Sequence, residues 1–92
     1  MWMRIITSSF DPAREAEILK LVEETYWPAL KAVPGFTSYV AGSKDGRTTA
    51  VLMFDTEDAP GRVDPSVRAA VEAAGVTVHS IEEYEITRRL TP

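Results

Sequence analysis

The chain has 92 residues, of which 45% are apolar and 26% are charged, and its formal net charge is −4. This length and composition predict a single domain over residues 1–92 with a packed core. The acidic balance gives no reason to expect a nucleic-acid partner, because such proteins carry a basic face. The sequence has no cysteine and one histidine, which excludes disulfides, thiol nucleophiles and a multi-histidine metal site within one chain. No apolar run reaches membrane-spanning length and the N-terminus has no signal-peptide core, which favours a cytoplasmic protein.

The first third of the chain predicts a strand followed by a helix. Residues 2–9 are rich in Ile and Thr, and Asp11-Pro12 then begins a helix, because Asp accepts from first-turn N–H groups and Pro needs no donor there. Apolar residues recur at helical spacing as far as Val33 and form one core-facing stripe. Pro28 removes a main-chain hydrogen bond and is expected to kink or break the helix, which Pro34-Gly35 ends.

The middle of the chain predicts a β-hairpin. Residues 36–43 and 48–55 are apolar segments on either side of Asp45-Gly46, and both turn residues tolerate a positive φ. A two-residue turn at this place pairs Ser43 with Thr48 and fixes the register along both strands.

The last part of the chain predicts a loop, a second helix and a long strand. The loop covers 56–63, the helix 64–75 and the strand 76–90, where Ile81 breaks the alternation and indicates a bulge near 80–82. The order βαββαβ predicts a ferredoxin-like α+β fold, in which a four-stranded antiparallel sheet has both helices on one face.

Two helices can cover only one face of such a sheet, yet both faces of the predicted hairpin are apolar. One face carries Phe36, Val40, Val51 and Met53, and the other carries Tyr39, Ala41, Ala50, Leu52 and Phe54. We assign the second set to the uncovered face, where a contiguous apolar patch marks an interface or a ligand site. The simplest arrangement is a homodimer with sheet packed against sheet, and the alternative is a monomer whose second face is only weakly apolar.

Three segments of the chain resemble the dimeric α/β-barrel superfamily, and within it the antibiotic biosynthesis monooxygenase (ABM) family. They are PALKAVPGFTSY at 28–39, LMFDTEDA at 52–59 and YEITRRL at 84–90, and with the hairpin they span nearly the whole chain. The resemblance implies a homodimer through the open sheet face. Some members of the family are cofactor-free monooxygenases that act on aromatic or quinone-like polyketides, and others degrade haem.

The chain departs from the family pattern at several positions. Phe54, followed by Asp55-Thr56, stands where the family often has Trp followed by Glu-Ser. The haem-degrading branch has an Asn on the first strand and a His on the second helix. Here Thr7 occupies the Asn position and the helix 64–75 contains no His, so the resemblance disfavours haem degradation.

The candidate ligand pocket comprises five residues that lie on or beside the second sheet face. They are Arg4, Thr7, Tyr39, Leu52 and Phe54. Aromatic side chains beside small ones leave a hollow for a flat apolar ligand, although the same residues suit plain interface packing. Arg4 lies on a central strand, where it could hold an anionic ligand or form an ion pair with Glu83 or Glu85. Thr7 offers a hydroxyl, or is simply a good strand former.

Two further residues have open roles. His79 is a weak candidate for a general base because its ordinary pKa lies near neutrality, and the alternative is an exposed or structurally hydrogen-bonded side chain. Trp27 lies off the apolar stripe and either packs on Lys31, turns inward at Pro28 or covers a neighbouring element. Glu82 and Glu83 point to opposite faces, which argues against a metal site formed by carboxylates.

Two functions remain open from the sequence. The first is a cofactor-free monooxygenase that deprotonates a flat aromatic or quinone-like substrate, excludes water and orients it toward oxygen. The second is a non-catalytic dimer that binds a small molecule or acts as an interaction module. Neither hypothesis calls for a cofactor or a metal.

Overall fold

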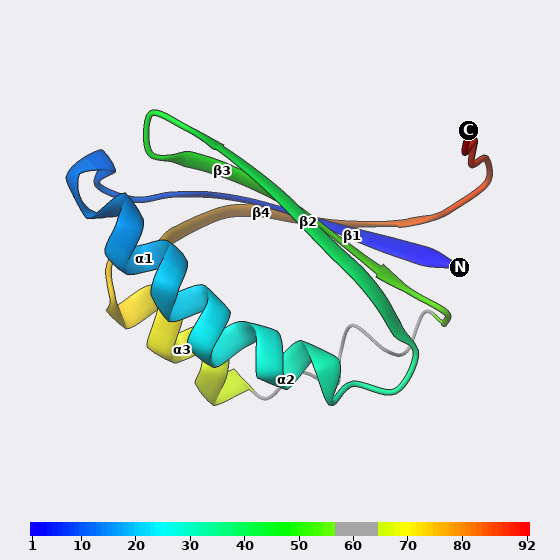
Figure 1. Cartoon of the computed structure of the whole chain (residues 1–92), viewed down its shortest axis with the longest axis horizontal. Helices are drawn as coiled ribbons and strands as arrows, with labels where there is room; N and C mark the ends of the chain where they lie inside the picture. Colours follow the sequence, from blue (N-terminus) through cyan, green and yellow to red (C-terminus); the bar gives the residue numbers. More distant parts are fainter. Residues whose placement is uncertain (57–64) are drawn as a thin grey trace.

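The computed structural model describes residues 1–56 and 65–92. Its four strands are β1 (Trp2–Ser9), β2 (Phe36–Lys44), β3 (Arg47–Phe54) and β4 (Thr77–Glu85). They form one antiparallel sheet in the order β2-β3-β1-β4, and the helices lie together below one face of it (Figure 1). The predicted ferredoxin-like α+β fold is confirmed.

The first helical segment is continuous but irregular. It consists of a 3₁₀ turn (Pro12–Arg14), α1 (Glu15–Leu21), a π-helical turn (Val22–Tyr26) and α2 (Trp27–Lys31). The Asp11 side chain accepts from the Ala13 N–H at 3.0 Å, as the predicted cap requires. The prediction that Pro28 kinks or breaks the helix is only partly right. The wider turn before it has the Trp27 N–H donating to the carbonyl of Val22, so the helix continues through the proline.

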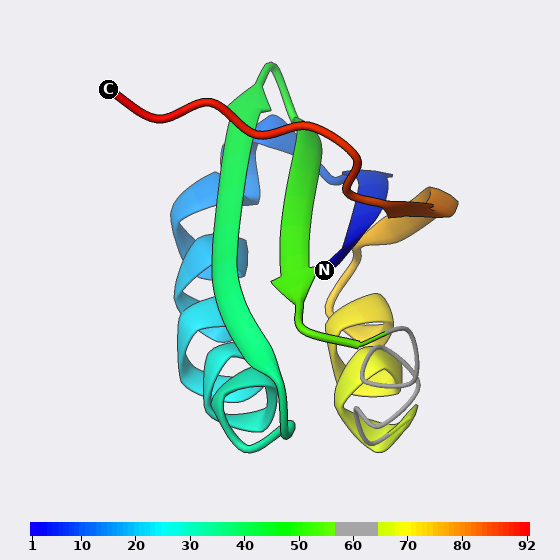
Figure 2. The same ribbon diagram turned by 90° about the vertical axis from the view of Figure 1, so that its right-hand side faces the viewer.

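The second helix, α3 (Pro65–Ala73), lies beside the first helical segment under the same sheet face (Figure 2). Gly75 ends it with a φ of +112°, the left-handed conformation that glycine adopts most easily. The predicted start of this helix at residue 64 and most of the predicted loop at 56–63 lie outside the described residues. Within the described residues, no helix is long and apolar enough to cross a bilayer.

The hairpin follows the predicted register over most of its length. Ser43 pairs with Thr48, and the turn residues Asp45 and Gly46 both have positive φ, at 51° and 78°. The register shifts near the start of β2, where Phe36 pairs with Phe54. This shift turns Phe36 toward the helices, and its ring meets that of Phe54 edge-on at 5.8 Å.

The assignment of the two sheet faces from the sequence was wrong. Leu52 and Phe54 are both 0% exposed, and they pack under the helices against Leu30 and Val33. Alternation along a hairpin shows which residues share a face, but it does not show which face the helices cover. The open face instead carries the other set of apolar residues, joined by residues of β1 and β4. Its apolar members are Met3, Ile5, Val40, Val51, Met53 and Tyr84.

Strand β4 contains the predicted bulge, displaced toward its start. Thr7 pairs with Ser80 and Ser8 with Val78, so His79 is the extra residue rather than one of 80–82. The strand ends at Glu85 instead of residue 90. Its partner β1 begins at Trp2, and beyond this point the Ile86 N–H donates to the Met1 carbonyl at 2.8 Å and Arg89 donates to the Met1 sulfur at 3.8 Å.

Candidate functional site

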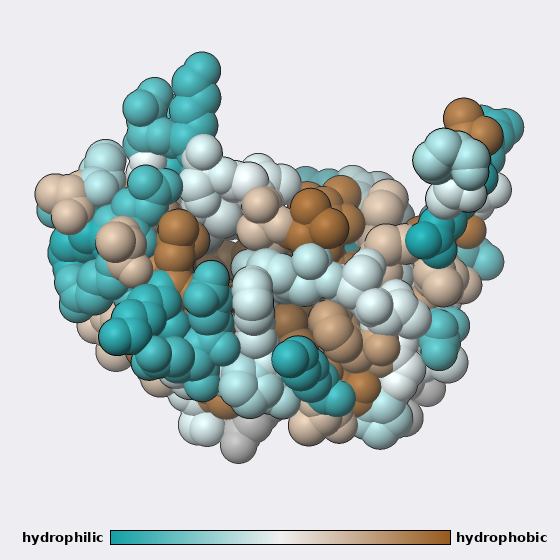
Figure 3. Space-filling view, viewed as in Figure 1, coloured by the Kyte–Doolittle hydropathy of each residue, from teal (hydrophilic) through white to brown (hydrophobic). Residues whose placement is uncertain are grey.

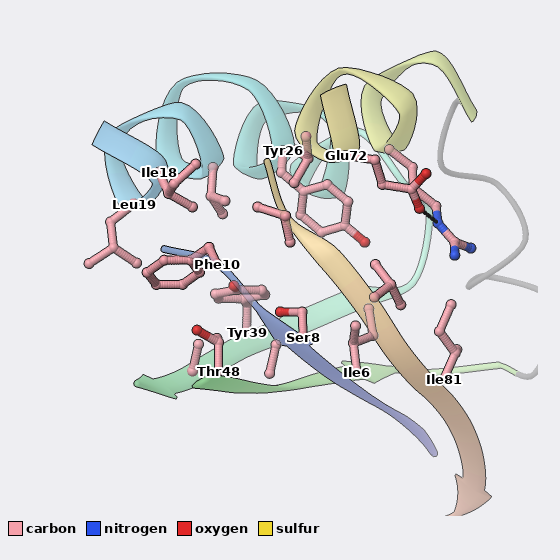
Figure 4. Close-up of a pocket in the computed structure, with 17 residues that line it drawn as sticks. Ile6, Ser8, Phe10, Ile18, Leu19, Tyr26, Tyr39, Thr48, Glu72 and Ile81 are labelled. Atoms are coloured by element: carbon pink, nitrogen blue, oxygen red, sulfur yellow. Dashed lines mark hydrogen bonds and ion pairs between the residues drawn. The ribbon is translucent and has the colours of Figure 1, made fainter. Parts of the chain in front are cut away.

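A cavity of about 110 Å³ lies between the sheet and the helical layer (Figure 4). All four strands contribute to its walls, together with α1, the π-helical turn and α3. The apolar lining residues are Ile6, Phe10, Ile18, Leu19, Val22, Ala41, Ala50, Val71, Val76, Val78 and Ile81. On the face of the molecule seen in Figure 3, apolar side chains are exposed between the helices and the sheet. Such a hollow suits an apolar ligand.

Six polar side chains interrupt this apolar lining. Ser8 and Thr48 contribute hydroxyls from the sheet floor, and Tyr39 contributes a phenol from β2. Tyr26 projects from the π-helical turn toward the strands (Figure 4). The remaining two, on α3, form an ion pair in which the Nε of Arg68 lies 2.9 Å from an oxygen of Glu72.

The two phenols of the cavity have raised pKa values. Burial raises the pKa of Tyr26, and the positive charges of Arg4 and Arg68 offset part of this rise. Burial also raises the pKa of Tyr39, Tyr26 adds to the effect, and the Trp27 indole N–H offsets part of it. Both side chains are therefore protonated at neutral pH and offer hydrogen-bond donors to a ligand oxygen.

The structure brings together only some of the predicted pocket residues. Tyr39 lines the cavity. Arg4 lies on the same helix-covered side, where its Nε is 3.7 Å from an oxygen of Glu83, so the ion-pair interpretation is confirmed. Leu52 and Phe54 lie in the solid core beside the cavity, because helix side chains fill the space against them.

Thr7 and His79 lie on the open face, so the sheet separates them from the cavity. The hydroxyl of Thr7 is 2.5 Å from that of Ser80. The Nε2 of His79 is 2.6 Å from the Oγ of Ser9, which favours the structurally hydrogen-bonded interpretation over a general base for this cavity. In the described part of the chain, no three His, Cys, Asp or Glu side chains gather closely enough to hold a metal ion.

Sequence reasoning missed four of the polar lining residues. Tyr26 belongs to the predicted apolar stripe, and a hydroxyl among core positions was the signal that could have identified it. Ser8, Arg68 and Glu72 gave no comparable signal, because Ser8 lies on β1 and the other two on α3, and only the packing of the helices under the sheet brings them to one space.

A second hollow of about 190 Å³ lies beside the first, between α2 and the start of β2. It is lined by Trp27, Leu30, Lys31, Phe36 and Tyr39. The rings of Trp27 and Tyr39 meet edge-on at 5.8 Å and 63°, so of the three placements weighed for Trp27 it covers a neighbouring strand. Tyr39 is the one residue that lines both hollows among the residues the structure describes.

Comparison with known proteins gives matches in structure alone. No protein-family model matches the chain, and no curated protein sequence matches it. SnoaB from Streptomyces nogalater, a cofactor-independent oxygenase, superposes with a TM-score of 0.77 at 16% identity over 99% of this chain and 98% of its own. The monooxygenase ActVA-Orf6 from Streptomyces coelicolor, in complex with nanaomycin D, gives 0.77 at 19% identity over 99% and 91%.

A variant of MhuD with two manganese protoporphyrin IX molecules bound per active site gives a TM-score of 0.75 at 16% identity, with both chains covered fully. The protein therefore has the same fold as these three solved structures, which agrees with the fold that the sequence resemblance implied. At these identities the likeness establishes the fold, and the chemistry must be argued from the cavity.

Proposed function

We propose that this protein is a cofactor-free monooxygenase that acts on a flat, hydroxylated or keto aromatic molecule. The observation that carries the proposal is the apolar cavity with two protonated phenols, Tyr26 and Tyr39, in a fold shared with SnoaB and ActVA-Orf6. An apolar space excludes water from a reactive carbanion, and the phenols donate to the oxygen that becomes negative.

The reaction is illustrated by an anthrone, whose ring CH₂ becomes a carbonyl. Before it enters the cavity, the substrate loses a proton to water and forms an enolate, and the enolate oxygen then accepts a hydrogen bond from Tyr26. The substrate then supplies four electrons to O₂, two C–H bonds break and one C=O bond forms. One oxygen atom enters the product and the other leaves as water, so anthrone plus O₂ gives anthraquinone plus H₂O without an external reductant.

The alternative is a non-catalytic module that binds the same class of molecule. One observation favours it: the sole carboxylate among the described lining residues, Glu72, is exposed and already paired with Arg68. A cavity without a free base can bind an aromatic ligand and leave it unchanged. Turnover therefore separates the two functions, because both require binding.

We also propose a homodimer formed through the open sheet face. The apolar side chains there include Val40, which is 67% exposed, and Tyr84, which is 44% exposed. With Ile5, Val51 and Met53 they form a contiguous patch that a second copy could cover. The expected partner is a second copy of the same chain. The sheet face that it would cover is the one opposite to the face assigned from the sequence. A cytoplasmic location belongs to this proposal and is tested by cell fractionation.

The deciding experiment measures oxygen consumption and anthraquinone formation from anthrone, with a chelator present to remove trace metals. We expect turnover above the uncatalysed rate. Tyr26→Phe should reduce it by about ten- to a hundredfold, because a hydrogen bond to a charged group contributes about 1.5–3 kcal/mol. His79→Gln is the matched control on the opposite face and should leave the rate unchanged. Binding of anthrone without any turnover would instead establish the non-catalytic module.

A further inference from the structure

The inner cavity and the outer hollow share one lining residue, Tyr39. Tyr39 lines the cavity on one side and the hollow formed with Trp27, Leu30, Lys31 and Phe36 on the other. Its ring lies half-buried on the edge strand β2, at the place where the two spaces meet.

Neither space alone accommodates a polycyclic molecule. A cavity of about 150 Å³ holds a single benzene ring, and ligand pockets usually measure about 300–1,000 Å³. The inner cavity measures about 110 Å³ and the outer hollow about 190 Å³. A ligand of three fused rings would need both spaces at once, which requires the Tyr39 ring to leave its position.

Tyr39 packs against the core cluster around Leu30 and Leu52 and also contacts Trp27, and the ring contact with Trp27 is weak. Its ring meets Trp27 edge-on at 5.8 Å, and such a pair contributes about 0.5–1.5 kcal/mol. Trp27 is itself 38% exposed, so it offers no rigid wall.

We propose that Tyr39 is a movable partition, and that its displacement joins the two hollows into one elongated site for a linear polycyclic aromatic molecule. This inference deepens the proposed function, on which its interpretation as a substrate site rests. The inner end presents the Tyr26 phenol to the reacting ring, and the outer end stacks the rest of the molecule between Trp27 and Phe36.

The outer end also indicates the charge of the ligand. Lys31 lines the outer hollow, and within the described part of the chain it takes part in no salt bridge. An ammonium group beside aromatic walls favours a ligand with a negative substituent on its outer ring. The expected class is therefore a flat, three-ring aromatic acid or phenolate.

Equilibrium dialysis with two stable probes tests the partition. Benzenesulfonate has one ring, which the outer hollow of about 190 Å³ beside Lys31 can hold without movement of Tyr39, whereas anthraquinone-2-sulfonate has three rings and needs both spaces. If the partition is closed in about nine molecules of ten, removing it strengthens binding of the larger probe by about tenfold. We therefore expect Tyr39→Ala to raise the affinity for anthraquinone-2-sulfonate about tenfold relative to benzenesulfonate. Tyr39→Phe keeps the ring and should retain the wild-type ratio.

Lys31→Gln tests the charge preference separately. It should weaken binding of anthraquinone-2-sulfonate and leave binding of the neutral 2-(hydroxymethyl)anthraquinone unchanged. Tyr39→Leu replaces Tyr39→Ala if the latter does not fold, with the same expected direction. An unchanged probe ratio in the smaller variant would overturn the partition. A changed ratio without any anthrone turnover would retain the partition and refute the oxygenase, so the two failures are distinguishable.

Discussion

Leu52 and Val51 are neighbours on β3 with opposite roles, and their substitution tests the assignment of the sheet faces. Leu52 is 0% exposed within the core cluster, so Leu52→Ala should destabilise the protein by about 2–5 kcal/mol. At about 4–8 °C per kcal/mol for a domain of this size, the melting temperature should fall by roughly 8 °C or more. Val51 lies on the open face, so Val51→Lys should change protomer stability by only about 0.5 kcal/mol.

The assay combines urea unfolding with sedimentation velocity over a range of protein concentrations. Val51→Lys should abolish the dimer, because a charge would have to be buried between two sheets. Leu52→Ala should lower the unfolding midpoint at every concentration and leave dimerisation of the folded fraction intact. The reverse pattern, with Leu52→Ala breaking the dimer at unchanged protomer stability, would show that the face assignment from the structure is wrong.

Two further predictions concern the hairpin turn and the cavity phenols. Gly46→Ala should destabilise the protein by about 1–3 kcal/mol, because the residue has a φ of +78° and a Cβ there would lie 2.4 Å from the Phe10 carbonyl oxygen. Gly42→Ala is the matched control, whose Cβ meets nothing within 4 Å, and thermal melting of both checks the difference. Burial raises the pKa of Tyr26 and Tyr39 above the ordinary value of 10.0. As the pH rises, the unfolded chain therefore loses these protons before the folded chain does, and the free energy of unfolding should fall above pH 10. Replacing both tyrosines by Phe should flatten that fall in urea titrations, and an unchanged slope would contradict the burial of the phenols.

The fold was predictable because its signals are local. The cap at Asp11, the turn at Asp45-Gly46 and the alternation of the strands each depend on residues close together in the chain. They act through hydrogen bonds and φ preferences that a sequence displays directly. The same holds for the bulge in β4, where a break in alternation placed it within a few residues of His79.

The site was less predictable because its residues meet only through packing between elements. Leu52 and Phe54 were expected to line a pocket, but they are buried against Leu30 and Val33, which the sequence could not place on either face. Tyr26 reaches the cavity from a π-helical turn, which is a local widening of the helix. The residue types of this segment do not predict such a turn.

The separation of the two sheet faces constrains the chemistry of the cavity. The one imidazole of the chain lies on the open face, bonded to Ser9, and the cavity phenols of Tyr26 and Tyr39 keep their protons at neutral pH. The cavity thus offers donors to an anion rather than a strong base that would create one. A substrate suited to it must therefore lose its proton readily to water. Its negative oxygen then accepts hydrogen bonds from the phenols, and these replace the hydrogen bonds to water that it loses on entering the cavity. Flat ketones and phenols with extended conjugation have this acidity, and extended conjugation also requires the length that the joined hollows supply.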